Sequence, residues 1–285
     1  MERRSIRLNN TRSRQLDGRD RPSSPAGALL RYWRNARHMS QLALALEAEV
    51  SPRHVSFVET GRSQPSREMI LLLAGTLDIP LREQNALLLA AGYAPIYEEA
   101  PPDLASDKLA PVRAALDAIL AHQEPYPAVV MNRHWDILLT NRAAERFFGM
   151  LLEGTTWEGS PNVVRMMFNP DALRPFVKNW KAVARTLIQR IHREAVGGVL
   201  DDTTTALLEE VLALPGVPAT WKTPNADQPL SPVIPMTFEK DDRVFNFFST
   251  VTTFGTPQDV LLQEIRIESF FPHDAETRRQ AEALG

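Results

Sequence analysis

The segment SQLALALEAEVSPRHVSFVETGRSQPS, residues 40–66, limits most strongly what this chain can fold into. Two short apolar-periodic runs lie on either side of a Ser-Pro dipeptide, and the second run ends at Gly61. Ser51 can cap a helix, and Pro52 then takes the first helical position, where its missing N–H costs nothing. The segment therefore predicts two short helices that lie side by side.

Helical periodicity continues on both sides of this pair. The runs PAGALLRYWRNARHM, REMILLLAGTLDI and PLREQNALLLAAGY each place apolar residues on one helical face. Together they predict a compact bundle of about five helices over residues 26–95. We expect the two central helices to be held together by Leu42, Leu46, Val50, Val55 and Val58.

Charge is unevenly distributed along the chain. Residues 1–95 contain 14 Arg, no Lys and 9 acidic residues, a net charge of +5, whereas the whole chain carries a net charge of -3. A basic end is expected to meet an anionic partner. Residues 1–25 lack apolar periodicity and predict a disordered basic arm. A transit peptide is the alternative, but this stretch lacks an amphipathic face.

Several classes of protein are disfavoured by composition. The 285 residues include no Cys, so neither a disulfide nor a thiolate zinc site can form. Apolar runs fall well short of the roughly 20 residues that cross a bilayer. We therefore expect a cytoplasmic protein with no membrane partner.

Catalytic and metal-binding patterns are also missing. The six His show no paired metal-ligand spacing, and we find no phosphate loop or nucleophile-elbow motif. Asp201 and Asp202 begin a predicted helix, where acidic residues more often cap than catalyse. We expect no enzyme, no metal and no cofactor.

The rest of the chain changes from helical to mixed periodicity. YPAVVMNRHWDILLTN predicts two strands joined at Asn132 and Arg133, and a helix is expected to begin near Asn141. The longest helical signal covers residues 170–194. Three β-branched and aromatic runs, IPMTFEK, RVFNFFSTVTTFG and DVLLQEIRIESFF, predict antiparallel strands. The sequence thus predicts a five-stranded sheet, with its first and last strands as neighbours, covered by helices.

The polar face of the second short helix is suited to duplex DNA. Two helices joined by a short turn can place the second in a major groove. Arg53, Ser56 and Phe57 should face outward, since Arg suits guanine and an aromatic ring suits the thymine methyl group. An ordinary helical bundle with a polar surface is the alternative. The candidate DNA-contacting residues are Gln41, Ser51, Pro52, Arg53, His54, Ser56, Phe57, Arg62, Ser63 and Ser66.

The run SPRHVSFVETGRSQPSREMILLLAGTLDIPLREQNALLLAAGYAP resembles the DNA-binding half of the xenobiotic-response-element-type (XRE) helix-turn-helix regulators, in the branch joined to an MmyB-like ligand-binding domain. The resemblance implies a structural salt bridge between Arg34 and Glu59. Glu49 departs from the family pattern, in which the turn often has Gly, and a positive φ there costs about 1 kcal/mol.

The segment AVVMNRHWDILLTNRAAERFFG resembles the opening of a PAS-like fold. The family resemblance implies a ligand-responsive transcription regulator with a long-chain fatty acid as ligand. Arg133, Arg165, Arg174 and Lys178 are candidate partners for its carboxylate. The candidate ligand-lining residues are Trp135, Phe147, Phe148, Met166, Met167, Phe176, Trp180, Phe245 and Phe247.

Two other functions remain open for the C-terminal half. Its aromatic residues can be core, in which case the domain is a protein-protein interaction module, or the domain can be an enzyme acting on a lipid. Reading a palindromic site requires a homodimer. The α+β chain is expected to comprise a basic arm (1–25), a helix-turn-helix DNA-binding domain (26–95), a linker (96–108), a PAS-like MmyB-type domain (109–272) and a C-terminal tail (273–285).

Overall fold

The computed structural model describes residues 24–98, 104, 106–155, 161–196, 201–222, 235–255 and 260–284. Contacts between Cα atoms divide the chain into two compact units. The first comprises residues up to 79 together with 86–94, and the second comprises 80–85 together with the chain from 95 onward. Within the described ranges, no helix is both long and apolar enough to span a membrane.

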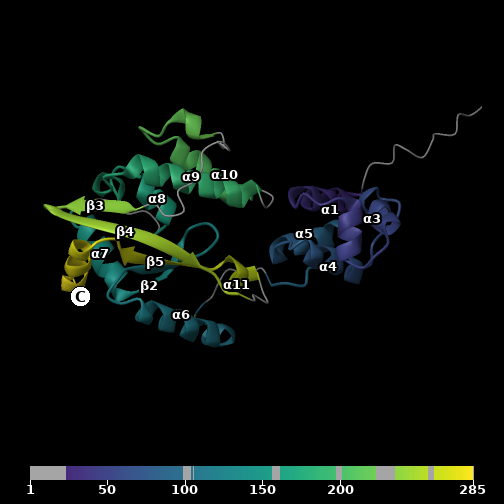
Figure 1. Ribbon diagram of the computed structural model, residues 1–285, viewed down its shortest axis with the longest axis horizontal. Helices are drawn as coiled ribbons and strands as arrows, with labels where there is room; N and C mark the ends of the chain where they lie inside the picture. The colour runs from purple at the N-terminus through teal and green to yellow at the C-terminus, as the bar shows by residue number, and fades with distance from the viewer. Residues whose placement is uncertain are drawn as a thin grey trace, which may run out of the picture. The chain divides into compact units, whose positions relative to one another are not determined.

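The first unit is the expected helical bundle (Figure 1). Its helices are α1 (Pro25–Ala36), α2 (Gln41–Glu47), α3 (Pro52–Glu59), α4 (Arg67–Thr76) and, from residue 86 on, α5 (Leu81–Ala90), as the sequence predicts. A serine hydroxyl caps each of the first four by accepting a backbone N–H, and these serines are Ser24, Ser40, Ser51 and Ser66. Local capping chemistry therefore sets where these helices begin.

The apolar face assigned to α2 is wrong. Leu42 and Leu46 are 56% and 70% exposed, and α2 buries Leu44 and Ala45 instead. A helix of seven residues makes about two turns, so its few apolar positions do not define which face is inward. Val55 of α3 is fully buried, as expected.

Helices α1 and α3 approach closely at Gly27. A β-carbon on this residue would lie 2.5 Å from the carbonyl oxygen of Val58 and 2.9 Å from that of Glu59. Only a residue without a side chain fits against these backbone oxygens. Gly27 therefore sets how near the α1 backbone lies to the end of α3.

The second unit consists of a sheet, seven α-helices and three short 3-10 helices within the described residues. The strands are β1 (Ala128–Met131), β2 (Ile137–Thr140), β3 (Met236–Lys240), β4 (Arg243–Thr252) and β5 (Arg266–Pro272). The α-helices are α6 (Ala110–His122), α7 (Arg142–Leu152), α8 (Val163–Phe168), α9 (Trp180–Val196), α10 (Asp202–Leu212), α11 (Val260–Glu264) and α12 (Ala275–Ala283). The 3-10 helices are η1 (Asp107–Leu109), η2 (Arg174–Phe176) and η3 (Ala219–Lys222).

The sheet is antiparallel, with strand order β2-β1-β5-β4-β3. The predicted neighbourhood of the first and last strands is confirmed, since β1 pairs with β5 in the register Val129↔Glu268. On the other side of β5, Glu268 lies opposite Val251 of β4. Glu268 thus occupies the middle strand of the sheet.

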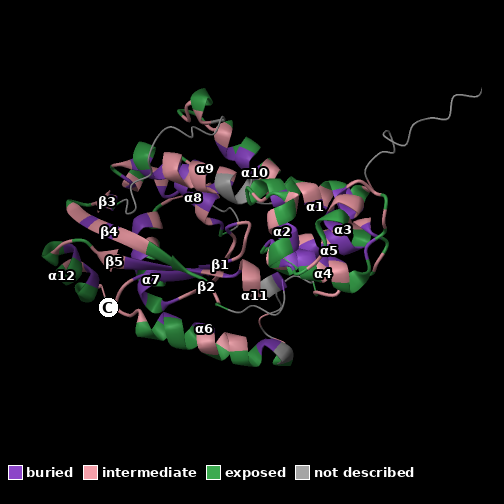
Figure 2. Ribbon diagram, turned by 45° about the vertical axis from the view of Figure 1, so that its right-hand side comes forward, coloured by how far each residue is buried: buried purple, intermediate pink, exposed green. Residues whose placement is uncertain are grey.

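Helices cover both faces of this sheet (Figures 1 and 2). Helix α6 packs Leu116 and Leu120 on one face, against residues that include Val130 and Ile267. The opposite face meets α7, α8, α9 and α10 in the larger apolar core, which contains Phe147. Helix α6 therefore lies on the sheet.

Three boundaries differ from the sequence-based expectation. The long helix begins at Trp180 instead of residue 170, because Val177 adopts extended backbone and bridges to Phe238 of β3. The run DVLLQEIRIESFF, predicted to be a strand, contains the short helix α11 before β5 begins. The expected tail contains α12, whose Thr277 is buried and accepts a hydrogen bond from the backbone N–H of Asn246.

Two expected segments fall largely outside the described residues. Residues 1–23 hold most of the predicted basic arm, whereas Ser24 and Pro25 form the cap and first residue of α1. In the predicted linker, residues 99–103 and 105 are not described, and η1 begins within it at Asp107.

Candidate functional site

Helix α3 presents a polar face away from the bundle core. The Oγ atom of Ser51 accepts the backbone N–H of His54 at 3.1 Å, which starts the helix. Val55 and Val58 are buried, whereas Arg53 is exposed and Ser56 and Phe57 are half-buried. The structure therefore brings together on one accessible face the side chains expected to meet DNA bases.

The Phe57 ring is flanked by two guanidinium groups. The Arg53 guanidinium carbon lies 5.0 Å from the ring centroid and that of Arg62 lies 5.8 Å from it. Both distances are within the range of cation–π attraction. Stacking on one ring restricts two otherwise flexible cations near the start and end of α3, which favours their use in binding an anion.

Glu59 ties α3 to α1 from the opposite side. Its carboxylate is fully buried and accepts hydrogen bonds from Arg34 Nε at 2.6 Å and Arg34 Nη2 at 3.0 Å. The hydrogen bond with Glu59 raises the pKa of Arg34, although burial acts in the opposite direction. The salt bridge that the family resemblance implies is therefore present. Gln41, one of the candidate DNA-contacting residues, donates its amide to Glu59 at 2.7 Å.

The loop after α3 is held by hydrogen bonds to the end of the first unit. Gln64 Nε2 donates to the Ala91 carbonyl at 3.2 Å, and the Tyr93 hydroxyl donates to the Pro65 carbonyl at 3.0 Å. Along this loop Arg62 and Ser66 are exposed and Ser63 is half-buried. A fixed loop can present phosphate-contacting groups in a constant register.

The turn before α3 contains the expected backbone strain. Glu49 has a φ of 54°, a left-handed conformation that favours glycine. The departure from the family pattern is therefore accommodated without a change of helix order.

An apolar cavity lies in the second unit between the sheet and helices α7, α8 and α9. The volume of this cavity is about 60 Å³. This is below the range of about 300–1,000 Å³ typical of small-molecule sites, so a long-chain ligand requires the lining side chains to move apart. The lining residues are Val129, Ile137, Phe148, Val163, Met166, Met167, Leu173, Val183, Leu187, Met236, Phe238, Glu268 and Phe270.

Phe148, Met166 and Met167 are the candidate ligand-lining residues that reach this cavity. Sequence reasoning favoured aromatic residues and so missed the aliphatic wall from β1, β2 and α9. Alternation along β5 could have indicated that Glu268 and Phe270 share a face, since residues two apart on a strand do so.

The other candidate ligand-lining residues lie elsewhere in the core. Phe147, Phe245 and Phe247 form a ring cluster, in which Phe147 contacts the other two edge-on at centroid distances of 5.2 and 5.3 Å. Trp180 donates its indole N–H to the Met167 carbonyl at 2.7 Å. Phe176 lies under the Lys240 ammonium, 5.3 Å from the ring centroid.

Trp135 has an unusual backbone and surroundings. It is 1% exposed with a φ of 69°, a strained conformation for a bulky residue. The Arg190 and Arg266 guanidinium carbons lie 4.6 and 5.6 Å from the centroid of its ring. These contacts place two cations near β5 that the sequence did not single out.

The four cations expected to hold a ligand carboxylate have protein partners. Arg165 pairs with Glu210 at 3.0 Å, and Lys178 forms an ion pair with Glu239. The Arg174 guanidinium carbon lies 4.0 Å from the Trp180 ring centroid, and its Nη1 donates to a backbone carbonyl at 2.6 Å. These groups hold the helices and strands together.

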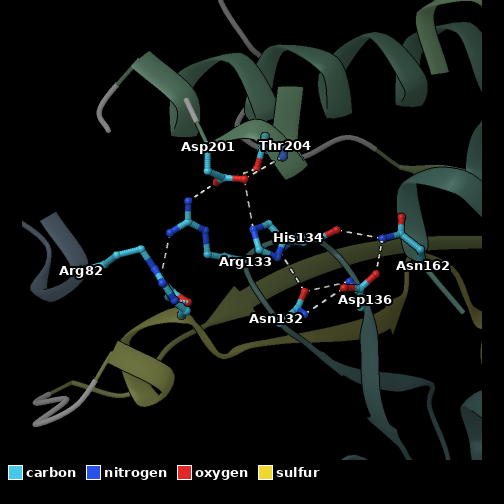
Figure 3. Close-up of polar contacts among 9 residues, drawn as sticks. Arg82, Asn132, Arg133, His134, Asp136, Asn162, Asp201 and Thr204 are labelled. Carbon is cyan, nitrogen blue, oxygen red and sulfur yellow. Dashed lines mark hydrogen bonds and ion pairs between the residues drawn. The ribbon is translucent and has the colours of Figure 1, made fainter. Parts of the chain in front are cut away.

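Arg133 belongs to a polar network at the β1–β2 turn (Figure 3). It forms ion pairs with Asp201, the cap of α10, and with Glu264 at 3.0 Å. Burial raises the pKa of Asp201, but hydrogen bonds from Thr204 and Arg133 outweigh it and lower that pKa to about 2. His134 lies 3.3 Å from the same carboxylate. The turn is thus anchored to a helix that covers the sheet.

The amide of Asn162 ties α8 to the same turn. Its Nδ2 donates to the His134 carbonyl and to Asp136 Oδ1, each at 2.8 Å, while its Oδ1 caps α8 (Figure 3). Because α8 supplies Met166 and Met167 to the cavity, this network positions part of the cavity wall.

The fold defines a two-domain protein: a helix-turn-helix bundle with an accessible second helix, followed by an α+β domain enclosing an apolar cavity. Comparison with family models supports both parts, with a helix-turn-helix match over residues 30–84 and a match to the MmyB-like transcription regulator ligand binding domain over residues 112–284. The chain belongs to the family of MmyB-like transcription regulators. The matches identify a helix-turn-helix followed by a ligand-binding domain, whereas the PAS-like label stays a prediction.

Comparisons with individual proteins add little. No curated protein matches the chain in sequence. The structure of an RNA-binding Light-Oxygen-Voltage receptor is similar at 12% identity and a TM-score of 0.25, over 92% of this chain and 62% of the receptor chain. This chain therefore spans less than two thirds of that receptor. ComR from Streptococcus suis is similar at 15% identity and a TM-score of 0.21, over 67% of this chain and 68% of that chain. TM-scores this low support no conclusion about function.

Proposed function

We propose that this regulator reads a palindromic DNA site through α3 and that a long-chain apolar molecule, of the fatty-acid class, occupies the cavity of its second domain and alters DNA affinity. The accessible, cation-bearing face of α3 is the observation that carries the DNA half of this proposal. We assign the chain no catalytic role and expect it to work in the cytoplasm.

Base recognition is assigned chiefly to Arg53, with Ser56 and Phe57 beside it. A guanidinium can donate two hydrogen bonds to one guanine, and the ring edge can meet a thymine methyl group. Recognition of two half-sites requires a homodimer with its α3 helices about 34–36 Å apart. The remaining proposed DNA-contacting residues are Gln41, Ser51, Pro52, His54, Arg62, Ser63 and Ser66.

The apolar wall of the cavity is the support for the ligand half. Each buried methylene stabilises a complex by about 0.8 kcal/mol, so about a dozen offer roughly 10 kcal/mol before ordering costs. Met166, Met167 and Met236 line the cavity, and methionine side chains change rotamer easily to fit a chain. Ligand can change DNA affinity only if it binds one conformation or dimer geometry better than another.

The DNA role is tested by comparing Arg53→Ala with Arg53→Lys. Selection of bound duplexes from a random pool gives the wild-type site. Both variants should lose preference at the contacted base pair by about 1–3 kcal/mol, while Arg53→Lys keeps more of its salt-dependent affinity because the charge remains. Unaltered base preference in both variants would remove Arg53 from base recognition.

The ligand role is tested on the purified full-length chain. Native mass spectrometry should find a retained apolar molecule, and removing it should change affinity for the selected site by about fivefold or more. An empty chain that instead captures a protein partner, with DNA affinity indifferent to added long-chain molecules, would favour an interaction module.

A further inference from the structure

Glu268 is the one ionisable residue among the thirteen that line the cavity. It lies on the central strand β5, between Val129 of β1 and Val251 of β4, and is 8% exposed. Phe270, two residues further along the strand, lines the same cavity. Burying a carboxyl group in an apolar wall costs free energy, so its presence there needs a physical explanation.

The surroundings of this carboxyl favour its uncharged form. Burial raises the pKa of Glu268, although the Ser249 hydroxyl and the positive charge of Arg190 oppose the increase. The Ser249 Oγ donates to Glu268 Oε1 at 2.6 Å. Arg190 of α9 lies over the Trp135 ring.

We propose that Glu268 makes the cavity selective for a ligand whose polar end is uncharged and forms hydrogen bonds, such as a long-chain alcohol or amide, over the ionised carboxylate of the same chain. The proposal rests on the proposed function, since it assumes that the cavity is the ligand site. It narrows the fatty-acid class to its uncharged forms and derivatives.

The selectivity follows from hydrogen-bond complementarity. An uncharged carboxyl has one donor and can accept, so a hydroxyl group can both accept from it and donate to it. An ionised fatty-acid head offers acceptors only. Beside an ionised Glu268 it places two negative charges together in an apolar space, and beside an uncharged Glu268 it accepts one hydrogen bond while its own charge stays buried in that space. Either protonation state of Glu268 therefore disfavours a bound carboxylate relative to an alcohol.

The test uses delipidated full-length protein and three ligands of equal chain length: dodecanol, dodecanoate and dodecylamine, titrated near neutral pH. We expect wild type to bind dodecanol about tenfold or more tighter than dodecanoate. In Glu268→Gln the side chain cannot carry a negative charge and its amide can donate to a carboxylate, so this ratio should fall to within about threefold. The matched control, Glu209→Gln on the exposed side of α10, should keep the wild-type ratio because Glu209 does not line the cavity.

A second variant keeps the proposal testable if Glu268→Gln unfolds. Ser249→Ala removes the hydroxyl that stabilises the ionised form, so the alcohol preference should decrease, because repulsion of a bound carboxylate needs an ionised Glu268. The proposal is overturned if wild type prefers dodecanoate or dodecylamine, or if the ratio is unchanged in Glu268→Gln or higher in Ser249→Ala. Failure of the proposed function looks different, since then none of the three ligands saturates any of these proteins.

Discussion

The buried ion pair between Arg34 and Glu59 gives the sharpest stability prediction for the DNA-binding domain. The Glu59 side chain is 0% exposed and that of Arg34 is 11% exposed, so neither charge can be rehydrated without opening the bundle. Replacing Glu59 with Leu leaves a guanidinium buried beside an apolar group. Removing one partner of a buried pair costs about 3–5 kcal/mol.

The double substitution should recover much of this loss. Arg34→Met with Glu59→Leu removes both charges, and an apolar pair of similar size is often neutral or stabilising. Recovery will be incomplete because Arg34 Nη1 also donates to the Met39 carbonyl at 2.7 Å, and Gln41 loses its acceptor. We expect a coupling free energy of at least about 2 kcal/mol between the two sites.

Amide hydrogen exchange on the full-length chain is the appropriate assay. Peptides from α1 and α3 report opening of the first domain, while peptides from β4 and β5 serve as an internal reference. A loss of 3–5 kcal/mol corresponds to exchange faster by roughly 150-fold to 4,000-fold. Single substitutions that each cost less than about 1 kcal/mol, with no coupling, would show that the pair behaves like an exposed one and would refute this reasoning.

Three further predictions concern packing, pH and capping. Gly27→Ala should destabilise the first domain by about 1–3 kcal/mol because of the 2.5 Å approach to the Val58 carbonyl, whereas Gly75→Ala, with nothing within 4 Å, should stabilise it by up to about 1 kcal/mol; urea denaturation of both variants compares them. Asp201 has its pKa lowered to about 2, so its stabilising contribution is present above about pH 4 and lost as the pH falls toward 2; melting temperatures of wild type and Asp201→Asn should converge over that window. The ammonium of Lys240 donates to three carbonyls at the end of α7 at 2.7–3.1 Å, so Lys240→Met should lower stability by about 1–3 kcal/mol in thermal unfolding, and an unchanged melting temperature would contradict that role.

Helix starts and strand pairing were open to prediction because they depend on rules that act over a few residues. A serine before each of the first helices supplies a cap, and Pro52 fits only the first turn of α3. Runs rich in β-branched and aromatic residues separated by turns indicated the strands of the sheet. The salt bridge of Arg34 with Glu59 came from the family resemblance and not from periodicity.

The inward face of α2, the late start of α9 and the wall of the apolar cavity were decided by tertiary packing. A seven-residue helix carries too few apolar positions to define its face, and Val177 is extended because β3 offers it a partner. The cavity is the space that side chains from the sheet and several helices leave unfilled. Which residues line it therefore depends on distances between segments that lie far apart in the sequence. For the same reason, the sequence shows Glu268 as one carboxylate among many, and only the folded sheet places it in an apolar wall.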